Sequence, residues 1–166
     1  MKTQHFVTLL VLVGSLVATS APASAQKIYW HHWENGSGKI RRADLDGSNV
    51  ENLIDLGSSG VGGIAVDQTG GKIYWTEEQL IRRANLDGTG AETVLVSDYP
   101  SALTIDEVNR RIYWAHGFEW TFGLSRADLD GQNAEIIGEF FPEGIDVDAL
   151  AGKIYFISFH GSIFLC

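Results

Sequence analysis

Three segments of the chain place acidic residues and a glycine at the spacing of a calcium-binding loop. They read ADLDGSN, ANLDGTG and ADLDGQN, at 43–49, 84–90 and 127–133. An EF-hand loop needs oxygen ligands at its first, third and fifth positions, Gly at the sixth and Glu at the twelfth. With Gly47 as the sixth residue, Arg42 is the first and Leu53 the twelfth. Two essential ligands are missing, and we predict neither a metal ion nor a cofactor.

A second metal hypothesis concerns His32, Glu77 and His116, which occupy equivalent positions in three successive copies of a longer repeat. Two His and one carboxylate form a ligand set that suits iron. Ligands of one zinc ion, for comparison, must converge to within about 2–2.2 Å of it, whereas equivalent positions of neighbouring repeats diverge. We therefore interpret these three side chains as solvated strand ends.

The longer repeat positions all of these residues. Its copies follow one another about every 41–43 residues and hold short runs rich in Ile, Val, Tyr and Trp, separated by Gly, Asp, Asn and Pro. Such runs are typical of strands and turns. Ile-Tyr-Trp or Ile-Tyr-Phe recurs at 28–30, 73–75, 112–114 and 154–156. Four short strands every ~40–45 residues are the signature of a propeller blade. We predict an all-β fold, a β-propeller of four-stranded antiparallel blades.

Within such a blade, Leu-Asp-Gly is the hairpin between the third and fourth strands. Asp accepts hydrogen bonds from turn amides, and Gly tolerates a positive φ. The Ile-Tyr-Trp runs are apolar on both sides instead of alternating, which indicates a sheet buried between two neighbouring blades.

The repeated residues resemble the YWTD repeat, also called the low-density lipoprotein receptor class B repeat. The resemblance covers 27–166, recurs about three and a half times and is clearest at 63–67 (GIAVD), 72–76 (KIYWT) and 81–89 (IRRANLDGT). It implies a six-bladed propeller that binds protein partners and is not catalytic. The family's cysteine-rich modules are absent. The Asp that closes the family tetrapeptide is replaced by His32, Glu77, His116 and Ser158.

Residues 1–25 read as a cleaved signal peptide. Lys2 precedes an apolar run over 6–17, and small residues precede Gln26, as in secretory signals. We expect a secreted or periplasmic protein in which 26–166 forms the propeller segment.

The chain has 12 basic and 21 acidic residues, a net charge of −9, which argues against nucleic acid as a partner. The apolar run is too short for membrane insertion.

The strands add up to about three and a half blades. They run from the second strand of one blade, through two complete blades, to the start of a third strand near 161–165. Six blades of this size need roughly 250 residues. We therefore expect a partial six-bladed ring whose outer blades expose apolar faces. Missing C-terminal blades, a homodimer of half-rings and an open arc each account for that arrangement.

The candidate ligand-binding residues lie at the end of the blades that carries the turns between second and third strands and the connections between blades. They are aromatic or acidic: Trp33, Tyr99, Phe118, Trp120, Glu34 and Glu119. Exposed aromatic rings beside carboxylates can stack on sugars or hold a cationic peptide. In the alternative, the rings fold back over the blade edges. We expect the opposite end, with its Gly-rich and Leu-Asp-Gly turns, to be structural.

An enzymatic alternative rests on Asp67, Asp106 and Asp148, which could face the central channel as in lactonase-type propeller hydrolases with an axial acidic site. Each directly precedes a turn, where Asp usually bonds its own backbone. We therefore predict an exported, non-catalytic binding or scaffold module that recognises a protein, peptide or carbohydrate through one loop face. A propeller hydrolase and a ligand-free structural repeat remain the alternatives.

Overall fold

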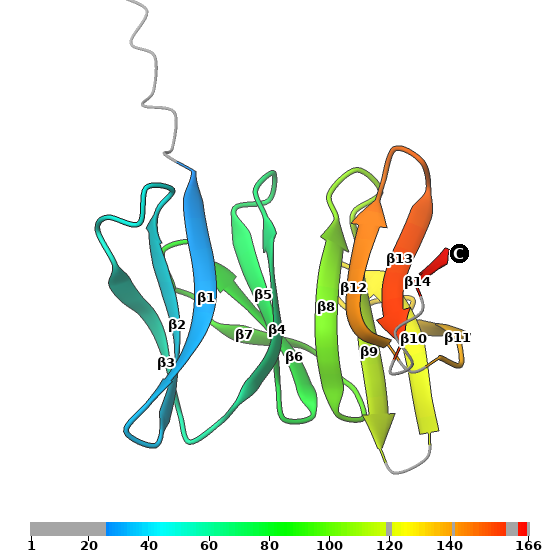
Figure 1. The fold of residues 1–166 in the computed structure, drawn as a ribbon, viewed down its shortest axis with the longest axis horizontal. Helices are drawn as coiled ribbons and strands as arrows, with labels where there is room; N and C mark the ends of the chain where they lie inside the picture. Colours follow the sequence, from blue (N-terminus) through cyan, green and yellow to red (C-terminus); the bar gives the residue numbers. More distant parts are fainter. Residues whose placement is uncertain (1–25, 119–120, 141, 159–162, 166) are drawn as a thin grey trace, which may run out of the picture.

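The protein forms four antiparallel sheets that stand side by side in an arc (Figure 1). This computed structural model describes residues 26–118, 121–140, 142–158 and 163–165, so the predicted signal peptide lies outside the described residues. Blades 1 and 2 contain β1 (Lys27–Glu34), β2 (Ser37–Asp44) and β3 (Glu51–Gly57), then β4 (Val61–Asp67), β5 (Lys72–Glu77), β6 (Leu80–Asn85) and β7 (Glu92–Val96). Blades 3 and 4 contain β8 (Pro100–Asp106), β9 (Arg111–Phe118), β10 (Thr121–Asp128) and β11 (Glu135–Gly138), then β12 (Pro142–Asp148), β13 (Lys153–Ser158) and β14 (Ile163–Leu165).

The strand order is that of propeller blades. Blade 2 pairs in the order β4-β5-β6-β7 and blade 3 in the order β8-β9-β10-β11, while blades 1 and 4 each pair three described strands. The first strands β4, β8 and β12 are neighbours from blade to blade. This confirms the predicted all-β propeller, with two complete blades between two partial ones. In the part of the chain that the structure describes, no helix is long and apolar enough to cross a membrane.

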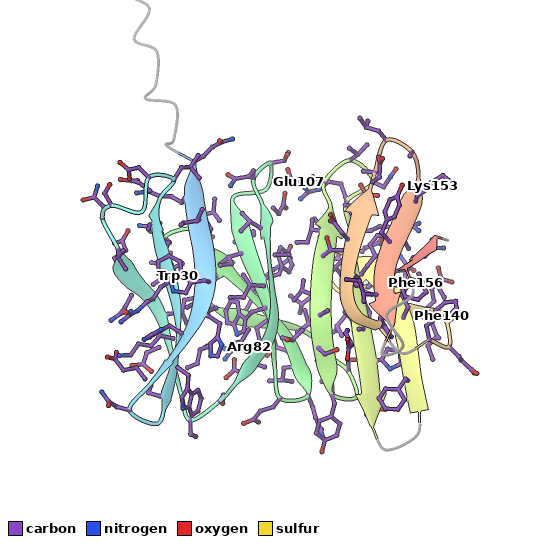
Figure 2. All side chains as sticks on the ribbon, in the orientation of Figure 1. Trp30, Arg82, Glu107, Phe140, Lys153 and Phe156 are labelled. Atoms are coloured by element: carbon purple, nitrogen blue, oxygen red, sulfur yellow. The ribbon has the colours of Figure 1, made fainter. Side chains whose placement is uncertain are left out.

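Each second strand meets a different neighbour with each of its two faces, because successive side chains of a strand point in opposite directions. In β5, Ile73 and Trp75 pack against blade 1, whereas Tyr74 packs against blade 3. In blade 4, Phe156 packs against blade 3, where its ring centroid lies 4.7 Å from that of Phe140 (Figure 2). Burial on both faces explains why these runs are apolar without alternation.

The Leu-Asp-Gly turns have the geometry that their sequence predicts. Gly47, Gly88 and Gly131 have φ angles of 81°, 83° and 86°. In each turn the Asp carboxylate accepts the backbone N–H two residues later, as Asp87 does from Thr89 at 3.0 Å. The prediction that Leu-Asp-Gly is the hairpin between third and fourth strands is confirmed.

The same turns join neighbouring blades. Arg42 Nη1 of blade 1 donates to the carbonyl of Leu86 in blade 2 at 2.6 Å. Arg83 Nη1 of blade 2 donates to the carbonyl of Leu129 in blade 3 at 2.9 Å, and the Tyr74 hydroxyl donates to the same carbonyl at 3.1 Å. The Leu carbonyl of each turn is therefore the acceptor in a bond that repeats from blade to blade.

Candidate functional site

The predicted ligand-binding end carries an exposed tryptophan on a strand. We name this end the Trp33 end; it comprises the β1–β2, β5–β6 and β9–β10 turns and the connections between blades, at the bottom of Figure 1. Trp33 lies in β1 opposite Gly38 of β2. Its indole carbons come within 3.4 Å of the position that a Cβ would take at Gly38. That is an ordinary contact distance, whereas a Cβ at Gly38 would clash with the Ser59 carbonyl oxygen. Half of the Trp33 surface stays exposed.

Trp33 and Glu34 lie in strand β1 and not in the turn that follows it. Blade 1 uses its additional residues to lengthen both strands of the hairpin, since β1 and β2 have eight residues each and β5 and β6 have six. The turn itself is Asn35-Gly36, with φ angles of 52° and 78°. Asn-Gly is the strongest short signal for a two-residue hairpin, so the sequence did contain this information.

Glu34 is held by basic side chains of the adjacent strand. Its Oε2 lies 3.4 Å from Arg41 Nη2 and 3.8 Å from Lys39 Nζ. Trp33 and Glu34 are consecutive in β1, so their side chains point to opposite faces of the sheet. Exposed tryptophan side chains are frequent anchors of protein-binding surfaces.

The other predicted binding residues belong to other blades. Tyr99 lies in the connection between blades 2 and 3, is partly exposed and has a φ of 45°. Phe118 is the last residue of β9, and its side chain lies outside the described part of the structure, as do Glu119 and Trp120. The structure therefore places Trp33 and Glu34 on opposite faces of one strand and Tyr99 at a separate point of the same end.

His32, Glu77 and His116 lie on three different sheets. His32 is partly exposed, as predicted, but it lies within β1 opposite Lys39 instead of at the strand end, and its Nε2 is 4.0 Å from Glu34. The same interpretation is wrong for His116, whose Nε2 is buried without a hydrogen-bond partner among the described residues and packs over Gly123. Burial lowers the pKa of His116, although the nearby Asp98 carboxylate acts in the opposite direction.

Side chains that lie far apart in the sequence could still converge on a metal ion. Within the described ranges, no group of three or more His, Cys, Asp and Glu side chains is arranged to hold one.

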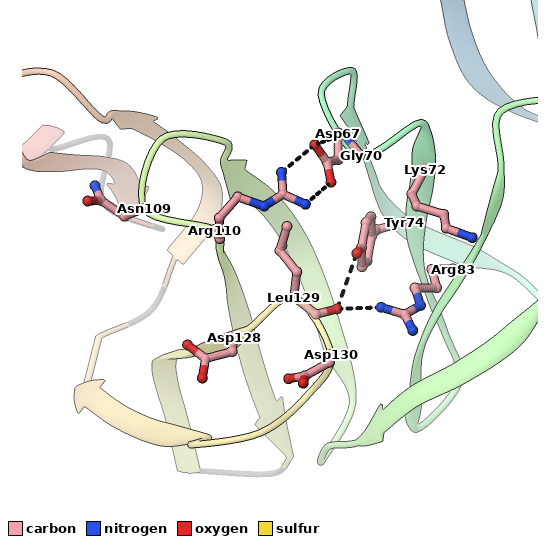
Figure 3. A pocket seen from close by; sticks show the side chains of 10 residues that line it. All are labelled: Asp67, Gly70, Lys72, Tyr74, Arg83, Asn109, Arg110, Asp128, Leu129 and Asp130. Carbon is pink, nitrogen blue, oxygen red and sulfur yellow. Dashed lines mark hydrogen bonds and ion pairs between the residues drawn. The ribbon is translucent and has the colours of Figure 1, made fainter.

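The opposite end of the blades, which we name the Asp67 end, carries a groove of about 420 Å³ between blades 2 and 3 (Figure 3). The fully buried Asp67 carboxylate accepts hydrogen bonds from Arg110 Nη1 and Nη2 at 2.8 and 2.7 Å and from the Gly70 N–H at 2.8 Å. Burial alone would raise the pKa of Asp67, but the guanidinium and the amide outweigh it, so the pKa is lowered. The carboxylate is therefore ionised and paired at neutral pH.

Apart from Arg83, which donates to the Leu129 carbonyl of blade 3, the other charged groups of the groove bond to residues nearby in the chain. Asp128 Oδ2 accepts from the Asn133 amide at 2.6 Å, and Lys72 Nζ donates to Asn85 Oδ1 at 2.6 Å. Asp130 accepts from the backbone of its own Leu-Asp-Gly turn. These pairings agree with the structural role expected of this end.

The aspartates considered for an axial acidic site also bond their own turns. Asp106 Oδ1 accepts the N–H of Asn109 at 2.8 Å, and Asp148 Oδ1 accepts the N–H of Ala151 at 2.9 Å. Asp67 makes the equivalent bond to Gly70. The prediction of backbone-bonded aspartates is confirmed at all three positions.

Sequence reasoning missed Arg110, which links blades 2 and 3 through Asp67. Its position in the first turn of the blade is held by glycine in the neighbouring repeats, at Gly71 and Gly152. An arginine that replaces a repeated glycine was the available signal. Its partner could not be named without knowing which turns face one another.

Comparison with known proteins identifies relatives over most of the chain. No protein-family model matches it. The cueball protein of Drosophila erecta is 28% identical over 157 residues, covering 86% of this chain and 24% of that protein. Low-density lipoprotein receptor-related protein 5 of Homo sapiens is 29% identical over 132 residues, covering 73% of this chain and 8% of that protein. A chain in the crystal structure of a nidogen/laminin complex is 26% identical with a TM-score of 0.73, covering 81% of this chain and 53% of that one. The chain is similar to YWTD β-propellers in its repeated sequence and its fold.

The YWTD motif of blade 2 has a visible role in holding the blades together. The Thr76 hydroxyl accepts two backbone N–H groups of β4 and donates to the Ser101 carbonyl of blade 3 at 3.0 Å. Glu77 stands where the YWTD family has Asp, and its Oε2 accepts from Trp75 Nε1 at 3.0 Å and Arg82 Nη1 at 3.2 Å. The chain spans about a quarter of the cueball protein, 24% of its length.

Proposed function

We propose that this YWTD propeller is an exported, non-catalytic module that binds a protein partner through the Trp33 end. The observation that carries the proposal is Trp33 itself, half exposed and fixed over Gly38. Binding energy at protein interfaces concentrates on a few tryptophan, tyrosine and arginine side chains. Arg41 and Glu34 form an ion pair on the opposite face of the same hairpin.

The relatives support binding as the general activity. A chain of the nidogen/laminin complex shares the fold and is 26% identical in sequence where the two align. The non-catalytic part of the proposal is supported by the acidic residues of the first strands. Asp67, Asp106 and Asp148 each accept a backbone N–H of their own turn, which occupies the groups that a hydrolase of lactonase type would use.

A peptide library displayed on phage tests the proposal and requires no named partner. Peptides are selected on the immobilised wild-type protein and then measured against two variants, Trp33→Ser and Leu150→Ser. Both side chains are exposed, but Leu150 lies in the turn after β12 at the Asp67 end. Selected peptides are expected to lose at least tenfold in affinity for Trp33→Ser and to bind Leu150→Ser like the wild type.

Peptides that bind both variants equally well would show that the Trp33 end is not the binding surface. A parallel screen on immobilised glycans covers the carbohydrate alternative. If glycans bind in a Trp33-dependent way and no peptide is enriched, the ligand of the Trp33 end is a carbohydrate and not a protein.

A further inference from the structure

The ring of Trp33 is directed at blade 2. It shares its face of β1 with Tyr29, which packs on blade 2, and with His31, whose ring centroid lies 6.5 Å from that of Trp33. Side chains two residues apart on a strand point the same way. The groups that blade 2 places beside Trp33 therefore decide which chemical group of a partner fits there.

The group that blade 2 contributes is the carboxylate of Glu78, which the connection between the blades links to Trp33 through Ser59. A Cβ at Gly38 would lie 3.4 Å from the Trp33 ring and would clash with the Ser59 carbonyl oxygen, so the ring and this carbonyl are neighbours. The Ser59 hydroxyl donates to Glu78 Oε1 at 3.2 Å. An exposed aromatic ring and an exposed carboxylate thus flank one serine.

The Glu78 carboxylate differs from the adjacent one in its partners. Glu77 Oε2 accepts from Arg82 Nη1 at 3.2 Å and is thereby paired with a cation. In the part of the chain that the structure describes, Glu78 has no such ion pair, and its hydrogen bond comes from the neutral Ser59 hydroxyl. A carboxylate binds a cationic donor more strongly than a neutral one, so Glu78 keeps the capacity to bind a cation.

Glu78 also occupies its turn at a structural cost. It is the first residue of the two-residue turn between β5 and β6 and has a φ of 54°. The same position of the β1–β2 turn holds Asn35, with a φ of 52°. Positive φ angles suit Gly, Asn and Asp in such turns, whereas other residues are strained there. Strain kept at an exposed residue points to a function outside the fold.

Blade 2 itself shows how a tryptophan and a glutamate hold a cation. The Cζ atom of Arg82 lies 5.7 Å from the centroid of the Trp75 ring, while Nη1 donates to Glu77 Oε2. The negative face of the ring attracts the guanidinium, and the carboxylate forms a charge-assisted hydrogen bond with it. Trp33 and Glu78 supply the same two groups at the surface, where a partner can provide the cation.

We propose that the partner of this propeller presents a lysine or arginine side chain that binds between the Trp33 ring and the Glu78 carboxylate. This inference rests on the proposed function, because it names the chemistry that the Trp33 end recognises. The net charge of −9 attracts a basic segment toward the propeller before contact is made.

The peptides selected on the immobilised wild-type protein are the probes for this inference. Peptides that lose affinity for Trp33→Ser are expected to contain Lys or Arg, and replacing that residue by uncharged norleucine or citrulline should weaken binding by roughly tenfold. Glu78→Asn should cause a similar loss and reduce the dependence of binding on salt. The matched control is Glu135→Gln, which removes an exposed carboxylate at the Asp67 end of blade 3 and should leave the affinity unchanged.

Thermal denaturation of Glu78→Asn separates a role in binding from a role in folding. Asn tolerates a positive φ, so the variant should melt at or above the temperature of the wild type while it binds more weakly. A variant that loses both stability and affinity would assign Glu78 to the fold and overturn the inference.

The inference and the proposed function fail in different ways. If Trp33-dependent peptides lack Lys and Arg, or bind Glu78→Asn like the wild type, the inference is wrong and Trp33 remains the binding residue. A carbohydrate ligand at the Trp33 end contradicts the inference as well. If no selected peptide depends on Trp33, the proposed function itself is wrong, and the inference falls with it.

Discussion

At the scale of single residues, Asp67 and Arg110 show how the propeller holds a charge in its interior. The carboxylate is fully buried, whereas the guanidinium is 46% exposed. Solvent screens the exposed side of the pair, so its contribution lies below the several kcal/mol that breaking a fully buried pair costs. The pair nevertheless joins two blades through residues that are 43 positions apart.

Replacing the carboxylate should therefore have a moderate cost. Asp67→Asn is expected to lower the free energy of unfolding by about 1.5–3 kcal/mol at pH 7, the range for hydrogen bonds to charged groups. Urea denaturation measures the change. Arg110→Met provides the comparison, and the double variant should cost less than the sum of the single ones because the two residues act as a pair. Fully additive losses would show that the residues stabilise the fold independently.

The same pair predicts a dependence on pH. The pKa of Asp67 is lowered in the folded protein, so its contribution is fully present above the unfolded value of about 3.9 and is lost as the pH falls through the folded value. The stability difference between wild type and Asp67→Asn should therefore shrink as the pH is lowered from about 5 toward 2. A difference that stays constant over this range would contradict the lowered pKa.

Gly88 and Gly47 occupy the same turn in different surroundings. Both have a positive φ, so Gly→Val at either position should cost about 1–3 kcal/mol of backbone strain. Only at Gly88 does the new side chain also meet the Leu53 carbonyl. Gly88→Val should therefore destabilise the chain more than Gly47→Val in thermal denaturation, and calcium should not raise either melting temperature. If both variants lose the same stability, the backbone strain of the turn alone accounts for the destabilisation, and the contact with Leu53 contributes nothing.

At the scale of strands and turns, the tyrosine of the repeat tests the bond between blades. Tyr74→Phe removes the hydroxyl that donates to the Leu129 carbonyl and should cost about 0.5–1.5 kcal/mol, the usual contribution of one hydrogen bond. Tyr155→Phe is the matched control, because the same position in blade 4 is exposed. The free energy of unfolding of Tyr155→Phe should therefore equal that of the wild type. A loss at Tyr155 as large as at Tyr74 would disprove the role of the bond.

The sequence predicts the strands well because the repeat supplies several copies of the same local information. The apolar run Ile73-Tyr74-Trp75 and the glycine of Leu-Asp-Gly specify strand and turn without reference to distant residues. The greater length of β1 and β2 does not follow from the repeat, although Asn35-Gly36 marks the turn between them. The site was harder to predict. The packing of Trp33 over Gly38 depends on strand register, and the burial of His116 depends on neighbouring strands.

At the scale of the whole molecule, export can be tested on the protein itself. The basic residue Lys2, the apolar run and the small residues before Gln26 predict cleavage after Ala25. Mass spectrometry of the secreted or periplasmic protein should therefore give a chain that begins at Gln26. A mature protein that keeps residues 1–25 would disprove the signal peptide and remove the basis for an exported function.

The bonds from Arg42 to Leu86 and from Arg83 to Leu129 tie each blade to the next one along the arc. Such an array behaves as a row of units coupled to their nearest neighbours. Opening an outer blade breaks one interface, whereas opening blade 2 or blade 3 breaks two. Amide hydrogen exchange should therefore be slowest in β5 and β9 and faster in β1 and β13, so that unfolding begins at the two ends of the arc and proceeds inward.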